Sequence, residues 1–510
     1  MKKPNLLLYV SDHFRSEALH HLGNEASNTP NFDNFIKEGV SFSNAFCQDP
    51  VCVPSRCSFL SGNYPHVGGF RTMHHLQSAH DQNFLKELKN NGYHIYFGGK
   101  NDVFSKEVPL IDYCDYRCDA YLEVQCLANG TSLPEGYHSI LKNYTQEDIL
   151  NSRSFVAKSS ILSDPDSKYY YSFFKGAIDT NNAMALGNQG AEDAQIYDAI
   201  NYIKNYHDDK PLCIYLSLLM PHPFYVCSKK DYQFIPVDKI SPCIRLNENE
   251  LALKPSIFKG IRENQRLNLW TDEELLDFKR TYLAMVHHVD ENFGKVLKAL
   301  KDKGIYDNTA IFSFSDHGDY ASDYEIAEIN QNTFEDVLTK VPLLIKPQST
   351  VIVLPGIRKC LVELIDIPDT IAELAGIKLS YPTFGKSLLP VLEKDTEHRD
   401  YVHCEGGRRE DETHCMDGGH NKLFWYWART SEQMKMPQHT KAVMIRNHHY
   451  KYVKRLYEKD EFYDLKSDPQ ERLNVIEQPE YKVIIDQFKI ALSNFMLETC
   501  DQVPYQRDER

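Results

Sequence analysis

A cysteine, a proline and an arginine lie close together at residues 52–56, in the run Cys-Val-Pro-Ser-Arg. Pro54 suits the first turn of a helix, because its fixed φ fits there and its missing N–H would be unpaired anyway. Cys52 is therefore expected at a helix N-terminus, where free N–H groups and the helix dipole favour an anionic substrate and lower the pKa of a thiol. Arg56 projects from the same turn and can neutralise an anion. The alternative interpretation is a buried structural cysteine followed by a surface arginine.

Two apolar runs end in an aspartate followed by a histidine. Asp12 and His13 follow the first run, and Asp316 and His317 follow a later one. A single aspartate at such a point is more often part of a turn or a helix cap. Together with Cys52, however, the two pairs predict oxygen and nitrogen ligands for a divalent cation at one edge of a parallel sheet.

The elements that must position these residues alternate along the chain, as in an α/β protein with a large, mainly parallel sheet flanked by helices. Strands are expected at 5–10, 39–46, 93–97, 211–219, 309–314 and 341–345. Helices are expected at 31–37, 81–90, 193–206, 271–303 and 361–375. Ligands bind beyond the carboxyl ends of the strands in such a sheet, which is where the two aspartates fall.

The pattern of the chain changes near residue 396. We expect a catalytic α/β domain over 1–395 and a smaller α+β domain over 396–510, with antiparallel strands at 441–446 and 450–457 and a final helix at 481–499. Residues 103–191 are irregular and aromatic, and they are expected to form an insertion near the site.

Composition excludes several classes of protein. A net charge of -15 argues against nucleic acid as a partner. Thirteen cysteines without a Cys-x-x-Cys pair indicate reduced thiols. No apolar stretch approaches the roughly 20 residues that span a bilayer. The short apolar run near the N-terminus reads as a strand and not as a signal peptide, so we expect a soluble, cytoplasmic protein with no membrane partner.

The run at 52–56 and the Asp-His strand ends resemble the type I sulfatases, which belong to the alkaline phosphatase superfamily. The resemblance implies an alkaline-phosphatase-like fold and the oxidation of Cys52 to formylglycine by a formylglycine-generating enzyme. The hydrated aldehyde of formylglycine carries two hydroxyls on one carbon. One attacks the sulfur of a sulfate ester, and the other then restores the aldehyde and expels sulfate.

The resemblance also implies a set of metal ligands. Residues matching the family's ligands are Asp12, Cys52, Asp316 and His317. His13 is a further candidate ligand at a position that is often Asp or Gln in the family. A set made mostly of oxygen atoms favours Ca²⁺, and histidine in the set leaves Mn²⁺ or Zn²⁺ open.

Two more motifs resemble family elements that contact the sulfate. Lys100 ends the run Gly-Gly-Lys, whose lysine contacts the formylglycine and the sulfate in the family. His222 lies in Pro-His-Pro, and the family's histidine there contacts the sulfate or protonates the leaving alcohol. Asp102 departs from the family, which usually has a histidine at that position.

A second departure concerns a lysine that binds the sulfate and the bridging oxygen in the family. Here an ungapped alignment places Gln331 or Asn332 at its position, and glutamine can donate a hydrogen bond but supplies no charge. His74 is expected to help bind the part of the substrate that leaves as an alcohol.

These observations favour an enzyme that hydrolyses the sulfate ester of a sulfated sugar or another small organic sulfate. One alternative is a phosphonate or phosphate monoester hydrolase of the same superfamily, which would use the same formylglycine. The other is a non-catalytic relative that binds an anion or a carbohydrate, for which the departures at Asp102 and Gln331 are the motivation.

Overall fold

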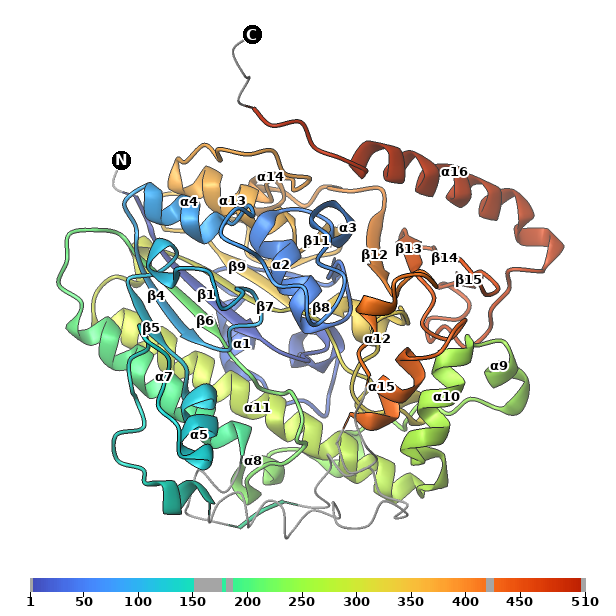
Figure 1. The fold of residues 1–510 in the computed structure, drawn as a ribbon, viewed down its shortest axis with the longest axis horizontal. Helices are drawn as coiled ribbons and strands as arrows, with labels where there is room; N and C mark the ends of the chain where they lie inside the picture. Colours follow the sequence, from blue (N-terminus) through green and yellow to red (C-terminus); the bar gives the residue numbers. More distant parts are fainter. Residues whose placement is uncertain (1–2, 151–176, 180–186, 419–425, 506–510) are drawn as a thin grey trace.

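The computed structural model describes residues 3–150, 177–179, 187–418 and 426–505 of the chain (Figure 1). The expected large, mainly parallel sheet flanked by helices is confirmed. Its strand order is β10-β2-β9-β7-β1-β6-β4-β5. These strands are β1 (Asn5–Ser11), β2 (Val40–Phe42), β4 (His94–Gly99), β5 (Tyr116–Cys118), β6 (Leu212–Ser217), β7 (Thr309–Ser315), β9 (Leu343–Lys346) and β10 (Gly356–Arg358).

The centre of the sheet is parallel. Strand β1 pairs in parallel with β6 and β7, and β4 pairs in parallel with β6 and β5, whereas β9 runs antiparallel to β7 and β2. Successive side chains of a strand point to opposite faces. Accordingly Leu6 and Leu8 belong to one hydrophobic core, while Leu7 and Tyr9 belong to another. Because both faces of β1 are covered, the strand is a nearly continuous apolar run.

Helices cover both faces of the sheet (Figure 1). The core that contains Leu6 is closed by α2 (Cys52–Ser61), α4 (Phe84–Asn90) and α13 (Asp366–Ala375). The core that contains Leu7 is closed by α1 (Pro30–Phe35), α7 (Asn188–Asn205) and α11 (Asp272–Asp302). Thr271 begins α11 with a capping box, since its side chain accepts from the Glu274 N–H and Glu274 bonds back to Thr271.

Among the α-helices whose full extent is described, those not yet named are shorter or lie outside these two layers. They are α3 (Pro65–Gly68), α5 (Ala120–Asn129), α8 (Lys229–Gln233), α9 (Glu248–Ala252), α10 (Ser256–Gln265), α12 (Asp336–Thr339), α14 (Leu389–Glu393), α15 (Trp427–Gln433) and α16 (Lys482–Thr499). Within the described ranges, no helix has the length and apolar character needed to cross a bilayer.

Several predicted elements differ from the structure. The strand expected at 39–46 is divided between β2 and β3 (Ala45–Phe46), which belongs to a separate sheet of order β11-β3-β8. The strand expected at 341–345 is likewise divided between β8 (Lys340–Val341) and β9, with Pro342 between them because proline has no N–H for a ladder. The helix expected at 361–375 begins only at Asp366, after strand β11 (Val362–Glu363).

The region expected to be an insertion, 103–191, is partly built into the main sheet. Its segment β5 forms the sheet's edge beside β4, and α5 packs against α7. Residues 151–176 and 180–186 of this region lie outside the described part of the chain.

The C-terminal region contains its own antiparallel sheet, of strands β12 (Val402–Gly406), β13 (Ala442–Arg446), β14 (Tyr450–Arg455) and β15 (Glu461–Asp464). Helix α16 packs on this sheet, where Phe488 and Phe495 join a core with Ile445 and Tyr452. The N–H of Glu405 in β12 donates to the carbonyl of Gln48, so this sheet lies against the loop that leads to Cys52. The domain boundary at 396 stays a prediction.

Candidate active site

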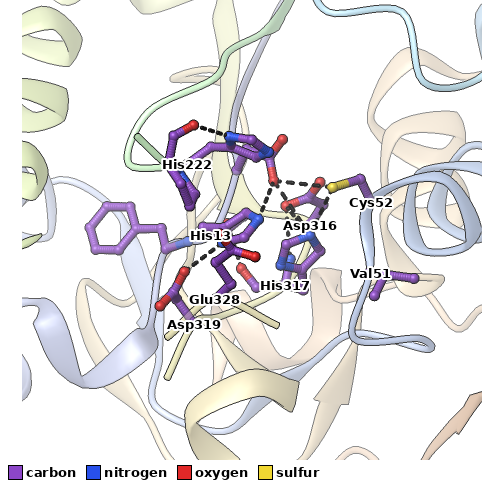
Figure 2. Close-up of polar contacts among 12 residues, drawn as sticks. His13, Val51, Cys52, His222, Asp316, His317, Asp319 and Glu328 are labelled. Atoms are coloured by element: carbon purple, nitrogen blue, oxygen red, sulfur yellow. Dashed lines mark hydrogen bonds and ion pairs between the residues drawn. The ribbon is translucent and has the colours of Figure 1, made fainter. Parts of the chain in front are cut away.

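The predicted chemical residues meet at the carboxyl ends of the central strands. Asp12 follows β1, Asp316 and His317 follow β7, and Lys100 follows β4. Cys52 is the first residue of α2, which begins beside the same edge. Figure 2 shows the side chains of Cys52, Asp316 and His317 drawn together there.

Cys52 is buried within reach of two other polar side chains. Its Sγ lies 3.5 Å from Asp12 Oδ1 and 3.2 Å from His317 Nε2. The expectation that the helix N-terminus lowers the pKa of this thiol is wrong. Burial raises the pKa of Cys52 well above its ordinary value, and the negative charge of Asp12 adds to the shift. An unmodified Cys52 is therefore a neutral thiol and a poor nucleophile.

Two cations balance the aspartates. The guanidinium of Arg56 is fully buried, with Nε 2.7 Å from Asp316 Oδ2 and an NH2 nitrogen 3.3 Å from Asp12 Oδ2. Lys100 Nζ lies 2.7 Å from Asp12 Oδ2 and 2.8 Å from Asp102. Burial opposes ionisation of Asp12, but Lys100 and Arg56 hold the pKa of Asp12 well below its usual range. Burial raises the pKa of Asp316 despite the neighbouring Arg56.

Three histidines surround the site, and each ring is held through its Nδ1 nitrogen. His317 Nδ1 donates to the Gly318 carbonyl over 2.9 Å, and His222 Nδ1 donates to the Pro223 carbonyl over 2.5 Å. A carbonyl can only accept, so the hydrogen must be on Nδ1 and the neutral ring carries a lone pair on Nε2. The ring of His13 lies 4.6 Å, between centroids, from each of the other two rings.

The donor atoms fit a divalent cation. Ligand atoms of Asp12, His13, Cys52 and His317 all lie within 4.8 Å of one another, and all four residues are buried. Asp316 is adjacent, with Oδ1 3.7 Å from His317 Nε2, but its other oxygen is engaged by Arg56. Formylglycine at position 52 would replace the sulfur of this set by oxygen.

Two other predicted site residues lie outside this group. The His74 side chain is 63% exposed, and its Nε2 lies 3.1 Å from Asp417 Oδ1. Both ends of the Gln331 amide contact protein atoms, because Nε2 donates to the Arg71 carbonyl and Oε1 lies 2.9 Å from His439 Nε2. The predicted substrate-binding roles of His74 and Gln331 stay predictions.

Two residues that influence this site were not predicted from the sequence. Asp319 holds His13 through a 2.5 Å contact between Asp319 Oδ2 and His13 Nδ1. Arg429, on α15 of the C-terminal region, is one of the charges that lower the pKa of His13, behind burial as the main cause. Asp319 carries a signal in hindsight, because it follows Asp316-His317-Gly318 directly, whereas only folding brings Arg429 near.

Comparison with known proteins agrees with this geometry. A family model described as Sulfatase matches residues 4–377. An arylsulfatase of Clostridium perfringens is 24% identical to this chain over 96% of this chain and 94% of its own length.

Solved structures share the fold. A phosphonate monoester hydrolase of Agrobacterium radiobacter superposes with a TM-score of 0.69 at 19% identity, over 98% of this chain and 96% of that one. A 2-O GAG sulfatase superposes with a TM-score of 0.66 at 20% identity, over 98% of this chain and 93% of that one.

Proposed function

Because this chain belongs to the sulfatase family and is a sulfuric ester hydrolase, we propose that it hydrolyses the sulfate ester of a sulfated sugar or another small organic sulfate with a formylglycine made from Cys52. The observation that carries the proposal is the position of Cys52. It lies at the N-terminus of α2, within 3.5 Å of Asp12 and His317, at the edge where Lys100 and Arg56 are held.

The chemistry needs Cys52 to be modified. As a thiol it is protonated, because burial and Asp12 raise its pKa, and attack at sulfur by a thiolate would leave a sulfo-enzyme that is hard to release. Formylglycine supplies a hydrated aldehyde whose two hydroxyls serve in turn for attack and for release of sulfate. The partner this requires is a formylglycine-generating enzyme.

Charge around Cys52 suits a monoanionic ester. Asp12, Asp316 and Asp102 carry three negative charges when ionised, and Arg56 and Lys100 carry two positive ones. These five side chains alone therefore sum to a charge near -1, which repels sulfate. A divalent cation brings it to about +1, which a sulfate monoester neutralises.

We assign the cation to Asp12, Asp316, His317 and residue 52, with His13 beside them. When bound, it would polarise a sulfate oxygen and the attacking hydroxyl as a Lewis acid. Family resemblance favours Ca²⁺ and leaves Mn²⁺ or Zn²⁺ open.

His222 is the residue best placed to protonate the leaving alcohol. Its Nδ1 is fixed by the Pro223 carbonyl, so Nε2 is the nitrogen that exchanges a proton. Burial lowers the pKa of His222 well below its ordinary value, and His13 and Lys100 add to the shift. The negative charge of the bound substrate must raise this pKa before His222 can act as an acid.

A phosphonate or phosphate monoester is the second candidate substrate. The observation that favours it is the engaged amide of Gln331, because the family's lysine is missing there and the charge balance for a monoanionic sulfate differs from that for a dianionic phosphate. The fold does not discriminate between the two candidates, because a phosphonate monoester hydrolase and a 2-O GAG sulfatase both share it with this chain.

Two measurements test the proposal. Mass spectrometry of the peptide that contains Cys52, from protein of the native host, must find the aldehyde or its hydrate; a free thiol there would refute the nucleophile. Matured enzyme is then assayed on an aryl sulfate and the matching aryl phosphonate. A higher kcat/KM for the sulfate is expected, and a strong preference for the phosphonate would reverse the order of the two candidates.

A substrate screen narrows the class further. The exposed His74 and the buried Asp417 form a pair in the region predicted to hold the leaving group, and hydrogen-bonding groups of this kind suit a sugar. Matured enzyme should therefore release sulfate faster from sulfated sugars than from steroid sulfates.

A further inference from the structure

We propose that His13, oriented by Asp319, is a metal ligand and that this pair makes the site select Zn²⁺ or Mn²⁺ over Ca²⁺. The inference rests on the cation of the proposed function and specifies its identity. It departs from the Ca²⁺ that family resemblance favours.

Asp319 fixes the orientation of the His13 ring. Its Oδ2 lies 2.5 Å from His13 Nδ1, and both side chains are almost completely buried. The same carboxylate accepts from the Tyr225 hydroxyl over 2.7 Å and from the Ala321 N–H over 2.6 Å. Because Asp319 accepts from every partner, His13 Nδ1 carries the hydrogen and Nε2 carries the lone pair. Carboxylate-to-histidine contacts of this kind orient metal-binding imidazoles.

The backbone of His13 is also constrained. Its φ is +64°, in the left-handed region, and its carbonyl accepts from the Tyr282 hydroxyl over 2.8 Å. A non-glycine residue adopts this conformation only against steric strain, and such residues are concentrated at functional sites. Tyr282 therefore fixes the backbone of His13 and Asp319 fixes its ring. The Nε2 atom of His13 lies 3.8 Å from Asp12 Oδ1.

A cation explains this arrangement better than direct binding of sulfate does. The Nε2 lone pair of His13 would repel a sulfate oxygen, which also offers only lone pairs. The Nε2 lone pair of His317 belongs to the same compact group, whose atoms lie within 4.8 Å of one another. A positive charge would stabilise these two lone pairs and the Asp12 carboxylate, whose atoms lie within 4.8 Å of one another.

The chemistry of the donors identifies the ion. Ca²⁺ takes six to eight oxygen ligands in proteins, whereas imidazole nitrogen suits Zn²⁺ and its neighbours. Replacing sulfur by oxygen at position 52 leaves two nitrogens among the four donors of the compact group. Zn²⁺ should bind more tightly than Mn²⁺, following the usual order for divalent ions, and both should bind more tightly than Ca²⁺.

The test measures binding, so it does not depend on turnover. Cys52→Ser protein is used, because an unmodified thiol would itself favour Zn²⁺. After removal of metal with a chelator, its affinities for Zn²⁺, Mn²⁺ and Ca²⁺ are measured by calorimetry and chelator competition. Zn²⁺ should bind on the order of 1000-fold more tightly than Ca²⁺.

Two further substitutions, made in the same Cys52→Ser protein, distinguish the role of His13 as a metal ligand from the role of Asp319, which orients it. His13→Gln installs a residue frequent in the family and should lower Zn²⁺ affinity at least about 100-fold while changing Ca²⁺ affinity little. Asp319→Asn should lower Zn²⁺ affinity by roughly 10- to 100-fold, as expected for loss of a group that orients a ligand. The d–d absorption of bound Co²⁺ should shift in His13→Gln.

His288→Gln is the matched control. His288 is also buried and bonded to carboxylates, with Nε2 2.8 Å from Asp193, but it lies on α11 outside the site. Its substitution should leave the affinities and the Co²⁺ spectrum unchanged. The inference would be overturned if Ca²⁺ bound as tightly as Zn²⁺. It would also be overturned if the metal affinities of His13→Gln and Asp319→Asn equalled those of this control. Either result would leave the proposed function intact. Failure of every ion to bind would overturn the proposed cation as well.

Discussion

Replacing Arg56 by glutamine should destabilise the protein by an amount that depends on bound metal. Arg56 is fully buried and is 2.7 Å from Asp316 and 3.3 Å from Asp12. Removing one partner of a buried ion pair costs about 3–5 kcal/mol, because the remaining charge has no counterion. For a domain of roughly 400 residues, the melting entropy is about 0.8 kcal/mol per degree, so Tm should fall by about 4–6 °C without metal.

A saturating divalent ion should reduce this loss to less than half. The ion supplies positive charge to the same carboxylates, and it binds the folded state only. Thermal unfolding of wild type and Arg56→Gln is followed by circular dichroism, first with EDTA and then with excess Zn²⁺ or Mn²⁺. The quantity of interest is the difference in Tm between the two proteins under each condition.

Arg399→Gln is the control, because Arg399 is also buried and also serves two carboxylates, Asp366 and Glu363. Asp366 and Glu363 are not among the candidate metal ligands. Arg399→Gln should therefore lower Tm by the same amount with EDTA and with metal. If Arg56→Gln also loses the same amount under both conditions, Asp12 and Asp316 do not share a metal site. A loss below 1 °C would refute the ion-pair reasoning itself.

Three other predictions concern catalysis, pH and substrate binding. His222→Asn should lower kcat by about 10²- to 10⁴-fold on alkyl sulfates but much less on nitrophenyl sulfate, whose leaving group needs no proton; equal losses would exclude a proton-donor role. Asp193 and Asp231 raise the pKa of His288 to about 9 against the opposing effect of burial. The charged form of His288 therefore stabilises the fold fully below pH 6.5, by about 3 kcal/mol, and this stabilisation disappears as pH rises to 9. Denaturation of His288→Gln and wild type should differ most at pH 6 and converge by pH 9.5, and a constant difference would contradict the shift. His74→Ala should raise KM several-fold for a sulfated sugar with little change in kcat, whereas unchanged KM values would place the leaving group elsewhere.

The sequence was sufficient for the order of the main elements and for the place of Cys52 at the start of a helix. Apolar runs such as 5–10 and 309–314 predicted strands correctly, since a strand buried on both faces must be apolar throughout. Pro54 placed Cys52 at the start of a helix, as the structure confirms. These features are local, because they depend on the conformational preferences of consecutive residues.

Predictions from the sequence failed where the secondary structure of a segment depends on strands that lie far away in the chain. The run 39–46 reads as one strand, but its two ends pair in different sheets, and 362–363 reads as helix but pairs with β3. The pKa of Cys52 was predicted with the wrong sign for a related reason. The helix N-terminus is a local feature, whereas the burial and the Asp12 charge that outweigh it come from the tertiary structure.

By itself, then, the sequence determined which residues could do chemistry and that several of them follow strands of one sheet. Only the tertiary structure decided how they act together. In the folded protein Asp319 contacts His13 Nδ1, and the ligand nitrogens of His13 and His317 lie within 4.8 Å of an Asp12 oxygen. The amide of Gln331 contacts Arg71 and His439. The physical reason is that charge, desolvation and hydrogen-bond direction depend on distances between segments far apart in the chain, which no local pattern encodes.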